Sequence, residues 1–301
     1  MKVLIAGASG LIGSEIRQQL TDTGHEVGVL TRPGSRPRPD STLSWQWQPA
    51  AGELDPAAIE WADAIVSLNG TSIAKLPWTR SRRHGILTSR IESTRTLARA
   101  IAASAAPPKA WVSASAVGFY GSRPGERLTE QADAGEGFLA EVTRRWEAAT
   151  NAATESTRVA HARTGIVLST RAALGPLVAL AKFGLAGRLG SGRQHWPWVS
   201  LRDEAAAYVH LATASEIAGP ANIAAPSGAT SEQVTRAVTR ALRRPHVLPA
   251  PAWALRAVLG AAADDLLLAD QQVVPERLTG EGFVFGDDDL NRAVREAVSM
   301  S

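Results

Sequence analysis

Apolar runs alternate with amphipathic stretches along most of the chain. Short runs rich in Val, Ile, Leu and Ala, such as residues 3–6 and 64–68, have the length and residue types of buried strands. Stretches such as 89–104 instead repeat apolar residues with helical spacing. Further strands are predicted at 26–30, 110–114, 159–163, 165–168 and 222–224, and further helices at 14–23, 137–153 and 203–213. Because strands and helices alternate, the pattern predicts an α/β protein with a doubly wound parallel sheet.

A glycine-rich turn, Gly7-Ala8-Ser9-Gly10-Leu11-Ile12-Gly13, joins the first strand to the first helix. Gly7 permits a tight turn, Gly10 lets the backbone approach a pyrophosphate, and Gly13 lets the helix pack closely on the strand. The helix start adds free N–H groups and the positive end of a dipole. Strand, turn, helix and second strand follow at the expected spacing. We therefore interpret the turn as a dinucleotide site rather than a packing turn.

The end of the second strand indicates which dinucleotide binds. NAD sites place Asp or Glu there to bind the ribose 2′-hydroxyl, whereas this chain has Thr31-Arg32, with Arg36 and Arg38 close behind. A guanidinium suits a 2′-phosphate, and a hydrogen bond of this charged kind contributes about 1.5–3 kcal/mol. The alternative is a solvated arginine in an arginine-rich chain. The strand-end position favours NADP(H) over NAD(H).

The residue composition of the sequence changes from about residue 174. Residues 184–198 are rich in glycine, arginine and tryptophan, which is typical of a loop or lid over a site. The segment from Pro245 onward contains an apolar helix at 252–263 and then Phe283-Val284-Phe285. We therefore expect a Rossmann domain that binds NADP at 1–170 and 203–225, and a smaller substrate-binding and C-terminal lobe at 171–202 and 226–301.

Composition narrows the class of protein further. The chain of 301 residues contains no cysteine, which excludes disulfides, thiol nucleophiles and Cys-ligated metals. Its formal net charge of +3 is too small to predict nucleic-acid binding. No secretory signal is recognisable, and no apolar run approaches the length that spans a bilayer. We expect a cytoplasmic protein without a nucleic-acid partner, a membrane partner or a bound metal.

Several short motifs are spread over the whole chain. They are SLNG at 67–70, PWT at 77–79, SRIEST at 89–94, SASAVGFYG at 113–121, RTGIVL at 163–168, GSGRQ at 190–194, WVSLRD at 198–203, VPERL at 274–278 and GFVF at 282–285. Together with the glycine turn and the strand-end arginine, they resemble the extended short-chain dehydrogenase/reductase superfamily. Within it, the chain is similar to the atypical subgroup labelled nucleoside-diphosphate-sugar epimerase-like, whose C-terminal appendage the last two motifs resemble.

This resemblance implies a Rossmann fold of the extended short-chain dehydrogenase type, with its site outside the carboxyl ends of the strands. It also implies a role for each matching residue. The residues that would hold the pyrophosphate are Gly7, Ser9, Gly10, Leu11, Ile12 and Gly13. Thr31 and Arg32 would hold the adenosine phosphate. The region of the central riboses would be lined by Leu68, Asn69 and Gly70. Ser113 and Ser115 would lie near the nicotinamide, with Ile166 and Val167 packed close to it.

The catalytic pair of that superfamily is missing from the chain. Active members use Tyr-x-x-x-Lys, in which lysine lowers the tyrosine pKa and the hydroxyl exchanges a proton with the substrate. The corresponding helix reads Phe138-Leu139-Ala140-Glu141-Val142, and neither Tyr120 nor Tyr208 has a lysine four residues on. Ser115 and Tyr120 are therefore the catalytic candidates, polarising the substrate oxygen. The alternatives are that Tyr120 only closes a Tyr-Gly turn and that Ser115 only bonds the backbone.

Other titratable residues give weaker signals. His195 lies in the predicted lid and could reach a substrate, although a lone histidine in a loop is more often a surface residue. His161 falls inside a predicted strand, and we interpret it as structural. No spacing of histidines and carboxylates indicates a metal site. Asp264-Asp265 and Asp287-Asp288-Asp289 have the pattern of helix caps or solvated turns.

Two functions follow from these observations. The first is an NADP(H)-dependent oxidoreductase or epimerase acting on a small polar or sugar-like substrate, as a monomer or homodimer. The second is a catalytically degenerate protein that binds NADPH as a redox sensor or scaffold. The complete glycine cradle supports the first function, and the missing Tyr-x-x-x-Lys pair supports the second.

Overall fold

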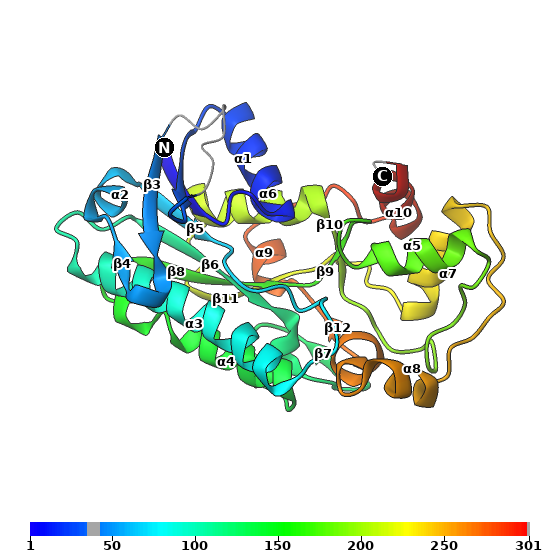
Figure 1. Cartoon of the computed structure of the whole chain (residues 1–301). Coiled ribbons are helices and arrows are strands. Elements are labelled where there is room, and N and C mark those ends of the chain that lie inside the picture. The colour runs from blue at the N-terminus through cyan, green and yellow to red at the C-terminus, as the bar shows by residue number, and fades with distance from the viewer. Residues whose placement is uncertain (35–42, 300–301) are drawn as a thin grey trace.

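An eight-stranded sheet forms the centre of the computed structural model, which describes residues 1–34 and 43–299 (Figure 1). Its strands lie in the order β11-β8-β6-β5-β1-β2-β3-β4. They are β1 (Lys2–Ala6), β2 (Glu26–Thr31), β3 (Leu43–Gln48), β4 (Glu53–Leu54), β5 (Ala64–Ser67), β6 (Ala110–Ala116), β8 (Arg158–Thr164) and β11 (Gly219–Ile223). Every neighbouring pair is parallel except β3 and β4. The predicted doubly wound parallel sheet is confirmed.

The order of the strands determines where a ligand would bind. β1 pairs with β2 on one side and with β5 on the other, so the winding of the sheet reverses at β1. Open α/β sheets bind ligands outside the carboxyl ends of their strands at such a switch point. The glycine turn begins directly after β1, at this point of the sheet.

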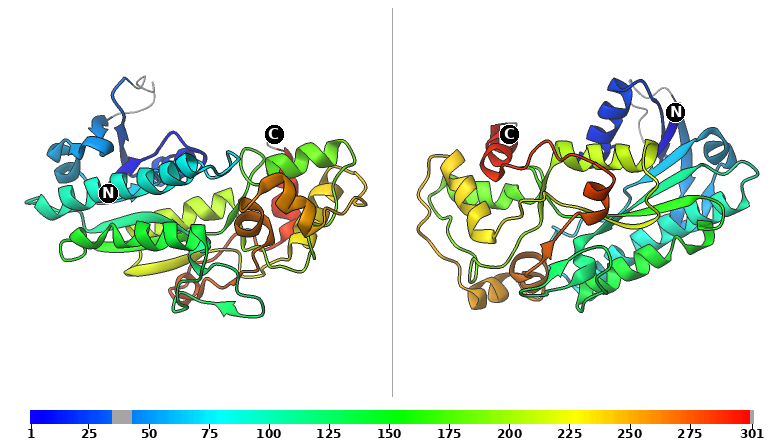
Figure 2. Two further views of the ribbon diagram at one scale, coloured as in Figure 1. Left: turned by 60° about the horizontal axis from the view of Figure 1, so that its bottom comes forward. Right: turned by 180° about the vertical axis from the view of Figure 1, so that it is seen from behind.

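Helices cover both faces of the sheet (Figure 2). One face carries α1 (Leu11–Asp22) and α6 (Leu201–Thr213), and the other carries α2 (Pro56–Trp61), α3 (Arg80–Ala103) and α4 (Phe138–Ala148). In β1, Val3 and Ile5 join the apolar cluster of α1 and α6, whereas Leu4 and Ala6 join that of α2 and α3. A strand buried on both faces appears as a continuous apolar run, which explains why residues 3–6 predict a strand.

A smaller lobe lies at one end of the sheet, on the right in Figure 1. It contains the parallel pair β9 (Ile166–Leu168) and β10 (Trp198–Ser200), together with α5 (Leu174–Lys182), α7 (Ser231–Ala241), α8 (Ala252–Leu259) and α10 (Leu290–Ser299). Leu174, Val234 and Val294 belong to its apolar core. The chain also returns to the large domain, through β12 (Gln272–Val273) paired with β7 (Arg127–Leu128) and through α9 (Glu276–Gly280). Leu278 and Phe285 are buried in the cluster of α1 and α6, so the C-terminal segment contributes to both cores.

Some element boundaries differ from those that the sequence predicted. β3 was not predicted from the sequence; at this strand, Trp45 packs on Trp61 with ring centroids 5.2 Å apart, over Gly28 of β2. α3 begins at Arg80 rather than at residue 89, because the Thr79 side chain accepts from the Arg82 N–H and caps a polar first turn. The predicted helices at 137–153 and 252–263 end earlier, at Ala148 and Leu259.

Candidate cofactor and substrate site

The glycine turn has a backbone geometry that other residues would not tolerate. Gly7 has φ +95°, in the region that glycine favours, and its carbonyl accepts the Gly10 N–H at 3.1 Å. A Cβ at Gly13 would lie 2.4 Å from Gly7 O, so packing requires glycine there. A Cβ at Gly10 would lie 3.4 Å from Gly7 O, an ordinary contact. Packing therefore does not explain Gly10, and the exposed backbone there is open to the approach of a ligand.

The start of α1 faces out of this turn without a cap. Gly10 is the N-cap residue and supplies no side chain, and the first turn of α1 contains no acidic residue. The N–H groups of Leu11, Ile12 and Gly13 therefore lack intrahelical acceptors. Ser9 and Gly10 are exposed. An uncapped helix start beside exposed glycine backbone fits a diphosphate.

The end of β2 carries the predicted cofactor-selecting residues. Leu30 of β2 pairs with Ala6 of β1, so Thr31 and Arg32 lie beside the glycine turn. Thr31 Oγ1 donates to Trp45 O at 3.3 Å, and the Arg32 side chain is exposed. Neither of these two residues is acidic. Arg36 and Arg38, which the sequence analysis also singled out, lie outside the described residues.

The turn after β5 meets the glycine turn. A Cβ at Gly7 would lie 3.2 Å from Leu68 Cβ, and a Cβ at Gly70 would lie 3.0 Å from the Arg90 guanidinium carbon. Asn69 Oδ1 is buried and has no hydrogen-bond partner among the described residues. A buried unpaired amide oxygen needs an explanation, and a hydroxyl of a cofactor ribose at this position would supply one.

Arg90 is a buried cation beside the same turn. It donates to Thr71 O and Ile86 O at 3.0 Å, and its guanidinium stacks over the Trp146 ring, 4.9 Å from the centroid. Burial lowers the pKa of Arg90 to about 10, so the group stays charged at neutral pH. The site therefore has a fixed positive charge that faces the loop at residues 69–71.

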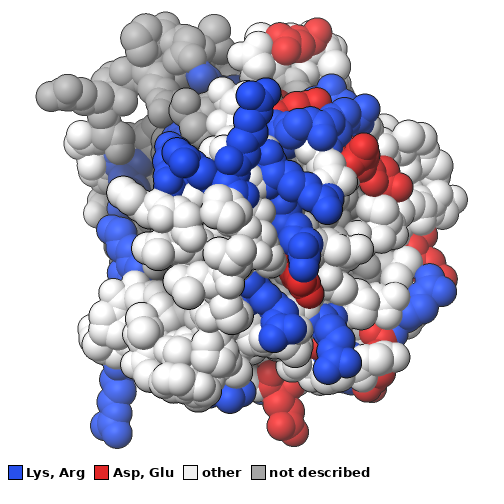
Figure 3. Space-filling model, turned by 90° about the vertical axis from the view of Figure 1, so that its right-hand side faces the viewer, with Lys and Arg blue, Asp and Glu red and all other residues white. Residues whose placement is uncertain are grey.

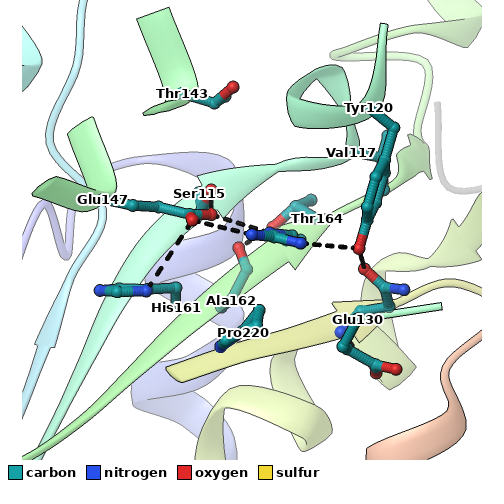
Figure 4. Close-up of polar contacts among 12 residues, drawn as sticks. Ser115, Val117, Tyr120, Glu130, Thr143, Glu147, His161, Ala162, Thr164 and Pro220 are labelled. Atoms are coloured by element: carbon teal, nitrogen blue, oxygen red, sulfur yellow. Dashed lines mark hydrogen bonds and ion pairs between the residues drawn. The ribbon is translucent and has the colours of Figure 1, made fainter. Parts of the chain in front are cut away.

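A buried polar network crosses the sheet under the proposed nicotinamide end (Figure 4). Ser115 Oγ donates to Glu147 Oε1 at 2.6 Å, and Arg163 donates to both oxygens of Glu147 at 2.9 Å. Arg163 also donates to Tyr120 Oη at 2.9 Å, and that hydroxyl donates to Asn222 Oδ1 at 2.7 Å. The five residues come from β6, the turn after it, α4, β8 and β11. The network therefore ties α4 to three strands of the sheet.

This geometry does not leave the predicted pair Ser115 and Tyr120 free for a substrate. Ser115 is 3% exposed and Tyr120 is fully buried. Burial raises the pKa of Tyr120 despite the opposing effect of Arg163, so the phenol stays neutral. The 3-10 turn Val117–Tyr120 directs the tyrosine ring into the interior, toward Asn222 on β11. The structure thus favours the alternative in which Tyr120 stabilises the turn, and it gives Ser115 a side-chain partner in place of the backbone.

Two further predicted groups lie at the same edge of the sheet. Ser113 is 1% exposed, and its Oγ has no hydrogen-bond partner in the part of the chain that the structure describes. Ile166 is half-buried and Val167 is buried, and both follow the carboxyl end of β8. These positions agree with an apolar and hydroxyl-bearing wall below the cofactor site.

The start of α4, where Tyr-x-x-x-Lys would begin, is filled by packing. Phe138 contacts Trp78 edge to face, with centroids 5.3 Å apart, and the Arg83 guanidinium lies 4.3 Å from the Phe138 centroid. Asp265, from a π-helical turn at Asp264–Leu268, accepts the backbone N–H of Leu139. Burial raises the pKa of Asp265. Asp265 is therefore a helix cap, as its sequence pattern suggested, but for a helix of the other domain.

His195 has a carboxylate partner that the sequence did not reveal. Its Nδ1 lies 2.8 Å from Asp270 Oδ1, which also accepts the His195 backbone N–H at 2.8 Å. The Asp270 backbone bonds Ser122 Oγ and the Arg123 N–H, directly after the turn that follows β6. The His195 side chain is 34% exposed. An oriented and accessible imidazole therefore lies where the lobe meets the carboxyl edge of the sheet.

Other classes of site find little support. Within residues 1–34 and 43–299, no group of three His, Cys, Asp or Glu residues could hold a metal ion. None of the described helices is long and apolar enough to cross a bilayer. A groove of about 600 Å³ lies between α3 and α4, lined by residues such as Leu87, Ile91 and Arg145. None of the residues assigned to the cofactor lines it.

Comparison with known proteins identifies the class. Residues 3–224 match the family described as the NAD dependent epimerase/dehydratase family, and residues 250–297 match a domain of unknown function, DUF1731. The chain therefore belongs to the NAD dependent epimerase/dehydratase family, which confirms the resemblance to extended short-chain dehydrogenases and to their C-terminal appendage.

Particular relatives match along the whole chain. Epimerase family protein MT2273 of Mycobacterium tuberculosis is 38% identical over 299 residues, covering 99% of this chain and 97% of the relative. Human epimerase family protein SDR39U1 is 32% identical over 303 residues, covering 99% of this chain and all of the relative. The crystal structure of the human protein with NADPH superimposes with a TM-score of 0.88 and covers 99% of both chains. A nucleoside-diphosphate sugar epimerase from Corynebacterium glutamicum gives a TM-score of 0.79 at 30% identity, covering all of this chain and 59% of that one.

Proposed function

We propose that the protein binds NADP(H) at the glycine turn and acts as an oxidoreductase or epimerase on a small polar or sugar-like substrate. The observation that carries the proposal is the glycine cradle at the switch point, with its uncapped helix start. Among the described residues, three helix N–H groups there lack intrahelical and side-chain acceptors, Gly10 has no packing reason to be glycine, and Asn69 Oδ1 has no partner. Such a set of unpaired groups fits a dinucleotide.

Arg32 is the residue that we propose selects NADP(H) over NAD(H). It follows β2 directly, its side chain is exposed, and the strand-end residues Thr31 and Arg32 are not acidic. The description of the family names NAD as the cofactor, whereas the human relative was crystallised with NADPH. Arg32 would hold the 2′-phosphate, the glycine turn the diphosphate, and the loop at 68–70 the central riboses.

The chain must also hold a substrate and move a proton. When bound, NADP(H) would supply or accept a hydride. We propose that His195 is the proton-transferring group, because Asp270 fixes its Nδ1 side and leaves Nε2 for a substrate oxygen. Ser115 and Tyr120 then act as positioning residues, since their hydroxyls hold α4 and the turn after β6 in place.

A second function is favoured by one observation, the packing around Phe138, where the resemblance places the catalytic tyrosine. Phe138 is packed between Trp78 and Arg83, and both predicted catalytic hydroxyls are engaged in the buried network. A protein that binds NADPH and reports its redox state would need the cradle and no proton donor. The cytoplasmic location and the monomeric or dimeric state stay predictions.

Cofactor titration tests the binding half of the proposal. Quenching of tryptophan fluorescence measures the affinity for NADPH and for NADH in the wild type, in Arg32→Ala and in Arg99→Ala, a control on the exposed face of α3. Arg32→Ala should weaken NADPH binding about tenfold to a hundredfold and NADH binding little, and Arg99→Ala should change neither. Equal losses for both dinucleotides in Arg32→Ala would remove the assignment of NADP(H).

A substrate screen separates the two functions. Carbonyl and sugar-nucleotide compounds are tested for NADPH-linked absorbance changes with the wild type and with His195→Asn. Turnover that Arg32→Ala weakens through KM and His195→Asn reduces through kcat supports the enzyme. NADPH binding without turnover of any compound would instead favour the sensor or scaffold.

A further inference from the structure

Exposed apolar side chains are concentrated on the small lobe. Seven of the eleven large hydrophobic side chains that are exposed among the described residues lie between positions 180 and 258. Four of them form what we call the lobe tip: Phe183 (81% exposed), Leu185 (50%), Val247 (70%) and Leu248 (52%). Patches of this kind on a folded domain mark interaction sites.

The two segments of the lobe tip lie side by side and are held in place. Val247 N–H and Leu248 N–H donate to Ala186 O, and a Cβ at Gly187 would lie 2.2 Å from Leu248 O. Ala186 itself is buried. Because the backbone is fixed against the lobe core, the four apolar side chains project outward as a consequence of the fold.

The lobe tip is surrounded by positive charge. The sequence contains no Asp or Glu between residues 156 and 202 or between 233 and 263. Five exposed cations belong to the segments around the tip, namely Lys182, Arg188, Arg240, Arg243 and Arg244. Figure 3 shows this side of the molecule, where Lys and Arg side chains form a band beside a broad uncharged area.

The backbone conformation of Arg243, one of these cations, is unusual. Arg243 has φ +53°, directly after the C-cap residue of α7. Glycine is the usual residue at such a left-handed position, and a long side chain there is strained. The helix dipole favours cations at the ends of α5 and α7, and Arg188, which lies outside both helices, interacts with Glu232 at the start of α7.

We infer that the lobe tip docks onto an anionic lipid bilayer, with the four apolar side chains in the interface and the surrounding cations against lipid phosphates. Apolar side chains that project among cations are the pattern of interfacial membrane binding. The cations alone could bind an acidic protein or a nucleic acid, so neither partner would explain the exposed Phe and Val side chains. The lack of a long apolar run excludes only helices that span the bilayer. The sequence-based expectation of no membrane partner is therefore replaced by the inference that the lobe tip binds the membrane surface. The inference is independent of NADP(H) binding.

Vesicle sedimentation tests the inference with the full chain. Wild type is mixed with vesicles of phosphatidylcholine alone or with about 30% phosphatidylserine, at low and high salt. We expect binding to the anionic vesicles only, with a strong loss at high salt. Phe183→Ser/Val247→Ser and Arg243→Gln/Arg244→Gln should each lower the bound fraction about tenfold. Val284→Ser, at an equally exposed position (82%) outside the tip, should bind as wild type.

Thermal melting and NADPH titration confirm that each variant is folded. Wild type that binds neither kind of vesicle would overturn the inference, as would equal binding by Val284→Ser and the Phe183→Ser/Val247→Ser variant. Sedimentation velocity measures whether the protein is a monomer or a dimer. A dimer that Val247→Ser dissociates would assign the lobe tip to a second copy of the chain and overturn the assignment to lipid.

Discussion

The two halves of the proposed site are built in different ways. In the cofactor half, the cradle for the diphosphate is one continuous segment, residues 7–13, whose backbone supplies the turn and the free N–H groups. The half near the nicotinamide position depends on Ser115, Tyr120, Glu147 and Arg163 with Asn222, which the chain brings together from five elements. The first half is therefore a local property of the backbone, and the second is a property of the whole sheet.

This difference predicts where substitutions destabilise the fold and where they affect binding. A buried charge pair such as Arg163 with Glu147 is costly to break, because the remaining charge stays buried without its partner. A glycine turn at the surface contributes less to folding but directly controls access to the backbone. The predictions below test this division, beginning with the largest expected effect.

Arg163→Met should lower the free energy of unfolding by about 3–5 kcal/mol, because Glu147 and Tyr120 would both lose a charged donor. Urea denaturation measures the change. The matched control is Arg145→Met, which removes an exposed partner of Glu141 and should cost about 1 kcal/mol or less. Equal losses in the two variants would show that the network does not stabilise the sheet.

Glu204 should make stability depend on pH. It is fully buried, its Oε1 accepts from Thr164 Oγ1 at 2.6 Å, and its Oε2 has no partner among the described residues. Burial raises the pKa of Glu204 from 4.5 to about 8, against the smaller effect of Thr164. Between these values the folded state holds a proton that the unfolded state has lost, so stability is full below pH 4.5 and falls as the pH rises toward 8.

The slope is at most about 1.4 kcal/mol for each pH unit in that window. Urea denaturation at several pH values between about 5 and 8 measures it. Glu204→Gln should flatten the dependence, because the amide does not titrate. A slope that persists in this variant would mean that another group carries the pH dependence.

Gly13→Ala should weaken NADPH binding by tenfold or more, which is about 1.4 kcal/mol, and should destabilise the fold by about 1–3 kcal/mol through overpacking against Gly7 O. Fluorescence titration and thermal melting measure the two effects. Gly85→Ala on α3 has open space around its Cβ and should leave binding unchanged while stabilising the helix by up to about 1 kcal/mol. Unchanged NADPH affinity in Gly13→Ala would contradict the assignment of the turn.

The same division explains what could be predicted from the sequence. The doubly wound parallel sheet and the glycine turn were predictable because local patterns mark their strands and helices, such as the apolar run at 3–6. The position of Tyr120 was not, because its proximity to Ser115 suggested a cleft-facing side chain and the 3-10 turn rotates it toward Asn222.

Partners that lie far away in the sequence were also missed. His195 and Asp270 are 75 residues apart, and no local pattern links them. The absence of Tyr-x-x-x-Lys at Phe138–Val142 can be read from the sequence, but the packing of Trp78 and Arg83 against Phe138 required the three-dimensional structure.

The carboxylate of Asp265 determines where the chain can be truncated without loss of a helix cap. Helix α4 begins after Gly137, which has no side chain to cap it, and the acceptor for its Leu139 N–H comes from more than a hundred residues downstream. A fragment that stops after the last strand of the large sheet would leave that N–H without this acceptor. The nucleotide-binding portion is therefore best produced together with its tail, and the boundary between the two family matches is a poor place to cut.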